Sequence, residues 1–172
     1  IKSDEIGLGS IDFNKVIPMP EHIFSGNLGM AEREKYGKDN WYDWSISNWG
    51  TKWNSYGYDG AYTPQDFDGE HIEFQTAWSR PENVIAILSA KHPELSLEHK
   101  WADEDFGYNV GHLEYEDGEE MFCDIPPGGS KEALEMAAEI HDVDLADEGY
   151  LYNEKTGEYE YHNPDESMSL KI

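Results

Sequence analysis

The sequence is short of basic residues. Its 172 residues contain 12 Lys and Arg against 37 Asp and Glu, which gives a net charge of −25. A protein that binds DNA or RNA through a broad basic surface needs the opposite sign, so we exclude that class. Adsorption to an anionic membrane surface is excluded for the same reason. We therefore expect neither a direct nucleic-acid partner nor a membrane partner.

The sequence is equally short of cysteine and of long apolar runs. Its single cysteine, Cys123, excludes an intramolecular disulfide framework and a four-thiolate zinc site. No run approaches the roughly 18 apolar residues of a transmembrane helix, and the first residues do not read as a signal peptide. These absences predict a cytoplasmic protein.

The motifs that usually announce catalysis are absent as well. The chain contains no HExxH, Walker A, GxGxxG or GxSxG sequence. Asp66–Glu70 and Asp142–Asp144 begin like calcium loops, but each lacks Gly at the sixth position and Glu at the twelfth. We therefore predict no cofactor, no metal site and no catalytic residue.

Two weaker alternatives stay open. His99 and His112 lie on neighbouring predicted strands and would suit a two-histidine site if they faced each other. Glu98 and Glu114 flank the same strands and would suit a carboxylate pair for acid–base work. Ordinary hydrogen-bonded or solvent-exposed sheet positions explain these residues better.

Aromatic residues are abundant at 13% of the chain, and they indicate a folded domain with a core. Alternation over residues 10–17 predicts a strand, and Met30–Tyr36 predicts one or two helical turns. The spacing of Trp41, Trp44 and Trp49 predicts a helix that ends at Gly50. Such indoles can stack on bases or sugars, but at this net charge we predict a structural role for them and for Trp53.

The stretch 71–120 predicts a strand, a helix and two further strands. Residues 71–78 alternate, Ser79 and Glu82 resemble a capping box, and a helix should follow over about 80–92. Strands should follow over 95–101 and 108–115. Six apolar side chains are predicted to be buried together: Ile72, Phe74, Trp78, Val84, Ile87 and Leu88.

A second segment follows the linker Pro126–Gly129. Ser130 should open a helix that extends to about His141, and the runs 150–152 and 158–161 should form a β-hairpin. We predict an α+β protein with a core over 1–125 and an acidic helix and hairpin extension over 126–172.

Several stretches resemble a known family. They are Ile11 to Pro20, Trp41 to Trp44, Asn48 to Trp53 and Phe74 to Pro81. They resemble the ferredoxin-like domain family of phage and plasmid proteins, called YubB-like or Api-like. The resemblance implies a ferredoxin-like antiparallel sheet with helices on one face, in a mobile-element protein inside a bacterial cell. Members begin with a strand and a helix before the Ile11 segment, and we expect this chain to lack both. The family supplies no catalytic residues.

The acidity is concentrated in the later part of the chain. Before residue 90 there are 7 basic and 14 acidic residues, a net of −7, and after it 5 and 23, a net of −18. If the net charge were spread evenly over a surface of about 8,600 Å², its density would be about one charge per 340 Å². Duplex DNA carries about one charge per 107 Å². Mimicry of nucleic acid therefore needs the acids to gather on about one third of the surface. The predicted patch consists of Asp103, Glu104, Asp105, Glu114, Glu116, Asp117, Glu119 and Glu120.

These observations favour a non-enzymatic acidic binding protein that engages a basic host protein, such as a nucleic-acid-binding or defence component, by charge mimicry. A solvated face that only keeps the protein soluble is the simpler interpretation of the acids. Two other classes stay open: a small hydrolase or metal-dependent enzyme, and an accessory structural protein. The pattern predicts no oligomeric state.

Overall fold

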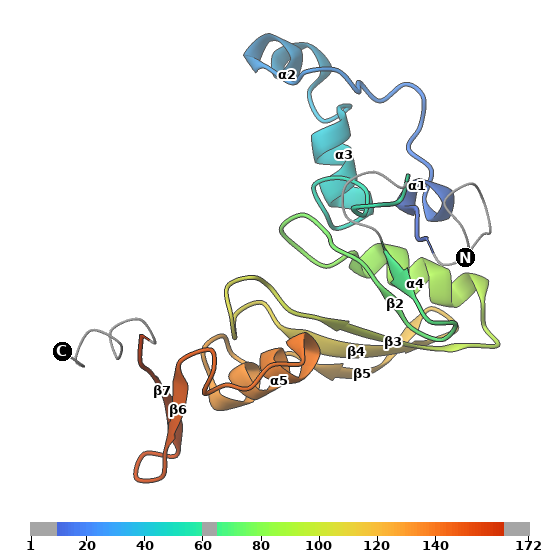
Figure 1. The fold of residues 1–172 in the computed structure, drawn as a ribbon. Helices are drawn as coiled ribbons and strands as arrows, with labels where there is room; N and C mark the ends of the chain where they lie inside the picture. Colours follow the sequence, from blue (N-terminus) through green and yellow to red (C-terminus); the bar gives the residue numbers. More distant parts are fainter. Residues whose placement is uncertain (1–9, 60–64, 164–172) are drawn as a thin grey trace. The chain divides into compact units, whose positions relative to one another are not determined.

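The computed structural model describes residues 10–59 and 65–163, and its mixture of helices and antiparallel strands is α+β (Figure 1). The helices are α1 (Phe13–Val16), α2 (Met30–Tyr36), α3 (Trp41–Asn48), α4 (Glu82–Lys91) and α5 (Lys131–His141). The strands are β1 (Asp66–Phe67), β2 (Ile72–Glu73), β3 (Ser96–Trp101), β4 (Gly111–Glu116), β5 (Glu119–Asp124), β6 (Tyr150–Asn153) and β7 (Glu158–Tyr161).

Contacts divide the chain into two compact units. The first unit comprises Ile1–Leu97 and Tyr115–Glu119, and the second comprises Glu98–Glu114 and Glu120–Ile172. This division differs in position from the predicted boundary between 125 and 126, which stays a prediction, as does the placing of the helices on one face of the sheet. The start of the predicted core, residues 1–9, and the end of the predicted extension, residues 164–172, lie outside the described residues.

The first unit begins with a helical turn where a strand was predicted. Asp12 caps α1 by accepting a hydrogen bond from the Asn14 N–H at 3.0 Å. The Asn54 side chain accepts from the Phe13 N–H at 2.8 Å and donates to Asp12 at 2.7 Å. The N–H groups of Phe13 and Asn14 therefore bond to side chains instead of to a neighbouring strand. The prediction of a strand over 10–17 is wrong.

The core of the first unit is built around Phe13. Its fully buried ring meets the edges of Trp49 and Phe74 at centroid distances of 6.1 and 6.0 Å, with Ile11 and Val84 buried beside it. These edge-type contacts suit the opposite partial charges of ring edge and ring face.

Helix α3 forms as predicted, and it positions two of the tryptophans in this core. Asn40 caps it by accepting hydrogen bonds from the Tyr42 and Asp43 N–H groups. Trp49 is 4% exposed and donates its indole N–H to the Ile17 carbonyl at 2.9 Å, and Trp44 packs against it. The structural role predicted for these two residues is confirmed. Met30–Tyr36 is also helical, as predicted.

The predicted strand over 71–78 is wrong beyond its first residues. Strand β2 has two residues and pairs with β1, so that Asp66 faces Glu73 and Phe67 faces Ile72. The Asp68 carboxylate closes the turn by accepting from the His71 and Glu70 N–H groups, which holds its pKa well below the usual value. Farther along, the backbone pairs with another loop, since the Gln75 carbonyl accepts from the Tyr56 N–H at 2.9 Å.

The short β2 changes which of the predicted residues are buried. Val84 is buried in the core around Phe13, and Ile72, Phe74 and Leu88 are half-buried against that core. Trp78 is 65% exposed and Ile87 is 38% exposed, so their predicted burial is wrong. At Trp78 the backbone has a left-handed φ of 71°, which is incompatible with the strand that the prediction of burial assumed.

Helix α4 is confirmed, but its predicted cap is wrong. The helix begins after Pro81 without a side-chain cap, and the Ser79 hydroxyl donates to the Gly50 carbonyl instead. A tertiary hydrogen bond therefore takes the side chain that would have capped the helix.

Strands β3, β4 and β5 form a three-stranded sheet in that order. The first two were predicted. Strand β5 was not, and all six of its residues are exposed. A strand without a buried face has no alternation to reveal it.

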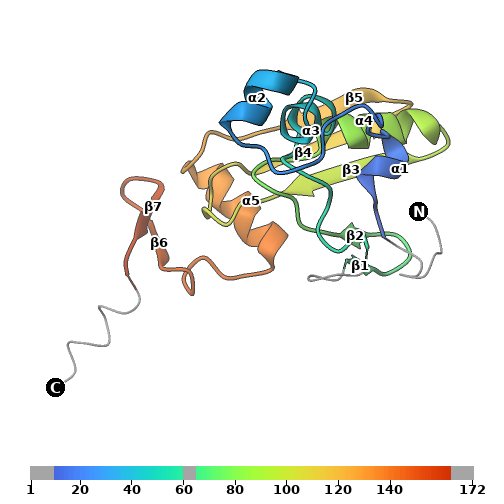
Figure 2. The ribbon, with the colours of Figure 1, turned by 90° about the horizontal axis from the view of Figure 1, so that it is seen from above.

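The second unit contains α5 and a hairpin. Ser130 caps α5 as predicted by accepting from the Ala133 N–H at 3.2 Å, and Ala133 and Ala137 are buried with Val110. Strands β6 and β7 pair antiparallel, with Tyr150 opposite Tyr161, as predicted. The helix and the hairpin lie side by side (Figures 1 and 2), and the Tyr159 hydroxyl donates to Glu135 at 3.3 Å.

Candidate functional site

The eight acidic residues predicted as a patch lie on three segments. Asp103–Asp105 belong to the loop between β3 and β4, Glu114 and Glu116 to β4, and the other three to the β4–β5 turn and β5. Six are exposed, and Asp103 and Glu114 are half-buried. The surface is therefore accessible at most of these positions.

The β4–β5 turn holds three of the acids in a defined geometry. Asp117 and Gly118 both have left-handed backbones, with φ of 49° and 81°, as in a tight two-residue hairpin. The Gly118 N–H donates to the Ser89 hydroxyl of α4 at 3.1 Å. A Cβ on Gly118 would lie 2.8 Å from the Ala90 Cβ, so only glycine fits. The turn is thus anchored, with Glu116, Asp117 and Glu119 exposed.

The loop between β3 and β4 uses one of its acids internally. The Asp103 carboxylate accepts from the Asp105 N–H at 3.1 Å and from the Asn109 side chain at 2.9 Å. Glu104 and Asp105 stay exposed. Asp103 therefore shapes the loop, and its two neighbours are the ones available to a partner.

Glu114 belongs to a polar network on the sheet. His112 Nε2 lies 3.0 Å from Glu98 and 3.6 Å from Glu114. Lys100 Nζ lies 3.2 Å from Glu98 and 3.3 Å from Glu139 of α5, and hydrogen bonds to these two carboxylates raise the pKa of Lys100. The Glu98 and Glu114 side chains are thus brought together through a histidine between them.

The alternative of a two-histidine site is wrong. His99 is 8% exposed, whereas His112 contacts the exposed Glu98. Glu98 precedes His99, and side chains alternate along a strand, so the two histidines point to opposite faces. No group of three or more His, Cys, Asp or Glu residues in 10–59 and 65–163 is placed to hold a metal ion.

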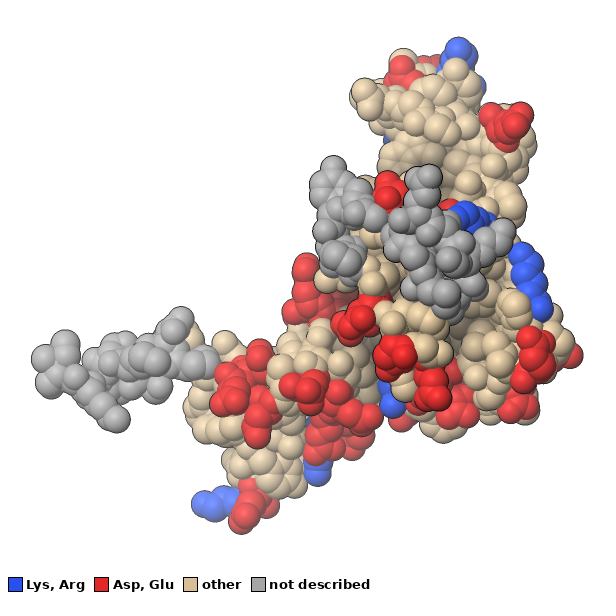
Figure 3. Space-filling view, turned by 45° about the vertical axis from the view of Figure 1, so that its right-hand side comes forward, with Lys and Arg blue, Asp and Glu red and all other residues tan. Residues whose placement is uncertain are grey.

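Negative charge is denser in the second unit. Its described residues, 98–114 and 120–163, contain three lysines and 17 Asp and Glu, a net charge of −14. Those of the first unit contain seven basic and 16 acidic residues, a net of −9 over a longer stretch. On the face in Figure 3, Asp and Glu cover far more of the surface than Lys and Arg.

The predicted patch is shared between the units. Glu116, Asp117 and Glu119 belong to the first, and the remaining members belong to the second. A single contiguous patch therefore stays a prediction.

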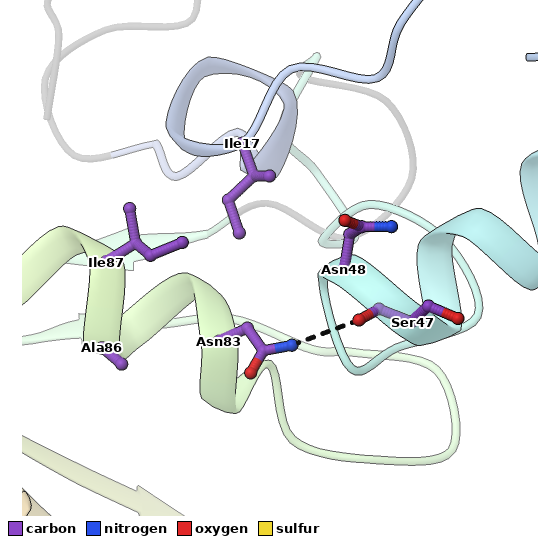
Figure 4. Close-up of a pocket in the computed structure, with 6 residues that line it drawn as sticks. All are labelled: Ile17, Ser47, Asn48, Asn83, Ala86 and Ile87. Carbon is purple, nitrogen blue, oxygen red and sulfur yellow. Dashed lines mark hydrogen bonds between the residues drawn. The ribbon is translucent and has the colours of Figure 1, made fainter.

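A small pocket lies between α3, α4 and the residue after α1 (Figure 4). It has a volume of about 230 Å³ and is lined by Ile17, Ser47, Asn48, Asn83, Ala86 and Ile87. The Asn83 side chain donates to the Ser47 carbonyl across it at 3.4 Å. These linings are neutral and offer no group for acid–base chemistry.

The sequence patterns missed an exposed aromatic cluster in the first unit. Lys52 Nζ lies 4.3 Å from the ring centre of Trp53 and 4.1 Å from that of Trp78. Trp53 is 37% exposed, so the predicted structural role does not describe it well. The adjacency of Lys52 and Trp53 was visible, but only the fold brings Trp78 to them.

The comparison with family models supports the ferredoxin-like part of the resemblance noted from the residues. A family model for the ferredoxin-like domain in Api92-like protein matches residues 57–144, slightly more than half of the chain. The matched span contains β1 to β5, α4 and α5, together with all eight predicted acidic residues. No curated protein and no solved structure matches the chain. In the described residues, no helix has the length and apolar character needed to span a membrane.

Proposed function

We propose that this chain, which belongs to the family of the ferredoxin-like domain in Api92-like protein, is a non-enzymatic binding module that recognises a basic protein through its acidic surface. The partner is a nucleic-acid-binding or defence protein of a bacterial host, which the module inhibits by imitating the charge of nucleic acid. A mobile element, phage or plasmid, encodes it, and it acts in the cytoplasm.

The net charge of −14 on the described residues of the second unit carries this proposal. Two of its three lysines, Lys100 and Lys131, already contact carboxylates of the same unit. Their positive charge is thus largely compensated from within. Such a surface attracts a basic partner over roughly one Debye length, about 10 Å at 0.1 M salt, and accelerates encounter.

The fixed geometry of the acidic turns supports a role in partner recognition instead of a role in solubility alone. The β4–β5 turn is held by Gly118 against α4, and the loop before β4 is closed by Asp103. Carboxylates on anchored turns lose little conformational freedom when a partner binds, so more of the electrostatic attraction appears as affinity.

The test compares variants that each remove three negative charges. The first-unit variant carries Glu116→Gln, Asp117→Asn and Glu119→Gln. The second-unit variant carries Glu104→Gln, Asp105→Asn and Glu120→Gln. The matched control changes exposed acids outside the predicted patch: Glu21→Gln, Glu34→Gln and Asp39→Asn.

Each variant is used to capture partners from bacterial lysate at about 0.1 M and about 1 M salt, where the Debye length falls from about 10 to about 3 Å. We expect the wild type and the control to capture the same basic protein at low salt, and at least one patch variant to lose it. Equal capture by all four proteins would show that these acids do not recognise the partner. Equal loss from the control would show that they act only through net charge.

The mimicry of nucleic acid is tested separately, by competition with DNA. Duplex DNA added to the captured complex should release the partner in a concentration-dependent way, because both ligands would occupy one basic surface. A partner that binds DNA and this chain simultaneously would contradict charge mimicry while leaving protein binding intact.

A further inference from the structure

Three aromatic side chains and two cations of the first unit contact one another in a row. Arg33 lies over the Tyr42 ring at 5.1 Å, Tyr42 meets Trp78 edge-on at 6.3 Å, and Lys52 lies between Trp78 and Trp53. We call these residues, Arg33, Tyr42, Trp78, Lys52 and Trp53, the aromatic–cation ladder. It lies outside the acidic turn and belongs to one unit throughout.

Trp78 is the most unusual member of the ladder. Its indole is 65% exposed, and its backbone has a φ of 71°, a region that bulky side chains rarely occupy. Exposure of the largest apolar side chain and a left-handed backbone are each unfavourable, and here they coincide in one residue. The surrounding loop maintains them, with the Thr76 hydroxyl donating to the Ser79 carbonyl at 2.9 Å. Strain of this kind gathers at ligand-binding positions.

Lys52 supplies a cation with no carboxylate partner in the described residues. Arg80 contacts Glu82 at 2.8 Å, and Arg33 lies 3.9 Å from Asp43. The ammonium group of Lys52 instead contacts the two indole rings. In a chain with 37 acidic residues this is a selective arrangement, because it keeps one positive charge available beside two exposed rings.

We propose that the aromatic–cation ladder binds an unstacked nucleobase together with its phosphate, as presented by a single-stranded nucleic acid or a free nucleotide. The base would stack on the indole of Trp78, the more exposed of the two rings that Lys52 contacts, and the phosphate would meet the Lys52 ammonium. Interleaved rings and cations are the usual platform for single strands, since every base offers a face to stack on. The proposal goes beyond the binding of a basic protein and does not depend on it.

The net charge of −25 excludes nucleic-acid binding through a broad basic surface, but it does not exclude binding at this small site. Residues 30–59 contain four basic and five acidic residues, so this segment is nearly neutral. Stacking itself needs no charge, and only one phosphate contact is used. For a single strand, one such contact weakens affinity by about threefold when salt rises from about 50 to about 200 mM. Screening of the acidic remainder acts in the opposite direction, so the observed loss should be smaller still.

The test measures quenching of tryptophan fluorescence by three probes: an oligothymidylate of about 12 nucleotides, thymidine monophosphate, and a duplex of similar length. The variants are Trp78→Gly and Lys52→Gln. Glycine suits the left-handed backbone at 78, so loss of binding in this variant does not arise from misfolding. The matched controls are Tyr161→Ala, an exposed ring outside the ladder, and Lys38→Gln, an exposed cation outside it.

We expect the single strand or the nucleotide to bind, the duplex to bind weakly, and Trp78→Gly to lose at least about fivefold in affinity, the lower limit for one stacked base. Both controls should bind like the wild type. Comparing the first two probes identifies the source of the base.

The proposal is overturned if no probe quenches the wild type, or if Trp78→Gly binds as well as the wild type. Loss of a captured protein from Trp78→Gly, without any nucleotide binding, would overturn it in favour of a protein-binding hot spot.

Discussion

At the scale of single residues, the tryptophans show how surroundings decide a role that spacing alone does not. Trp49 is 4% exposed and satisfies its indole N–H with the Ile17 carbonyl. Trp78 is 65% exposed on a left-handed backbone. Trp49 was predicted to be structural and Trp78 to be buried, each from its place in a periodic pattern. Such a pattern shows which side of a segment a residue occupies, not whether another segment covers that side.

Replacement of Trp49 by alanine should lower the free energy of unfolding by about 3–5 kcal/mol, the usual range for a large buried ring. The change removes ring contacts with Phe13 and Trp44 and leaves the Ile17 carbonyl without its donor. Denaturant unfolding of the variant measures the loss. Trp53→Ala is the matched comparison, and its 37% exposed ring should cost less than half as much. Equal losses would contradict the assignment of Trp49 to the core.

At the scale of secondary structure, helices were predicted more accurately than strands. Helices α3, α4 and α5 all lie where periodicity predicted them, because their hydrogen bonds are local. The predicted strand over 10–17 is a helical turn, β2 has two residues, and β5 was missed. A strand needs hydrogen bonds to a neighbouring strand, and the packing of the whole chain determines which segment lies next to it.

The β4–β5 turn offers a test at this scale. Gly118→Ala should destabilise the protein by more than the roughly 1–2 kcal/mol of a left-handed alanine, because the new Cβ would also lie 2.8 Å from the Ala90 Cβ. Gly157→Ala is the control: its φ is +78°, but nothing lies within 4 Å of the added Cβ. Thermal unfolding of both variants separates strain from steric overlap. A Gly118 variant no less stable than the Gly157 variant would argue against a close turn–helix contact.

At the scale of the whole molecule, we expect repulsion between like charges to outweigh the ion pairs. The chain carries −25, and the ion pairs among its described residues are mostly between side chains that are at least partly exposed, where each contributes little. Salt weakens both the repulsion and these pairs, so the direction of its effect on stability shows which is larger.

We expect the Tm to rise as sodium chloride increases from about 0.01 to about 1 M, since the Debye length shrinks from about 30 to about 3 Å and the net repulsion fades. Each kilocalorie per mole gained should appear as about 2–4 °C in a chain of this length. Scanning calorimetry measures the shift, and the variant with Glu21, Glu34 and Asp39 neutralised should show a smaller one. A Tm that falls with salt would mean that the ion pairs outweigh the repulsion.

Composition and local spacing were enough to predict the α+β class, the longer helices, the Ser130 cap, the C-terminal hairpin and the acidic balance. These features depend on composition or on residues a few positions apart, which the chain carries wherever it folds. Three features became visible only in the folded chain: Ser79 bonds to Gly50 instead of capping α4, Glu98 and Glu114 meet at His112, and Trp78 lies exposed beside Lys52. Those contacts join residues on different segments, and their geometry follows from how the segments pack, which no local pattern encodes.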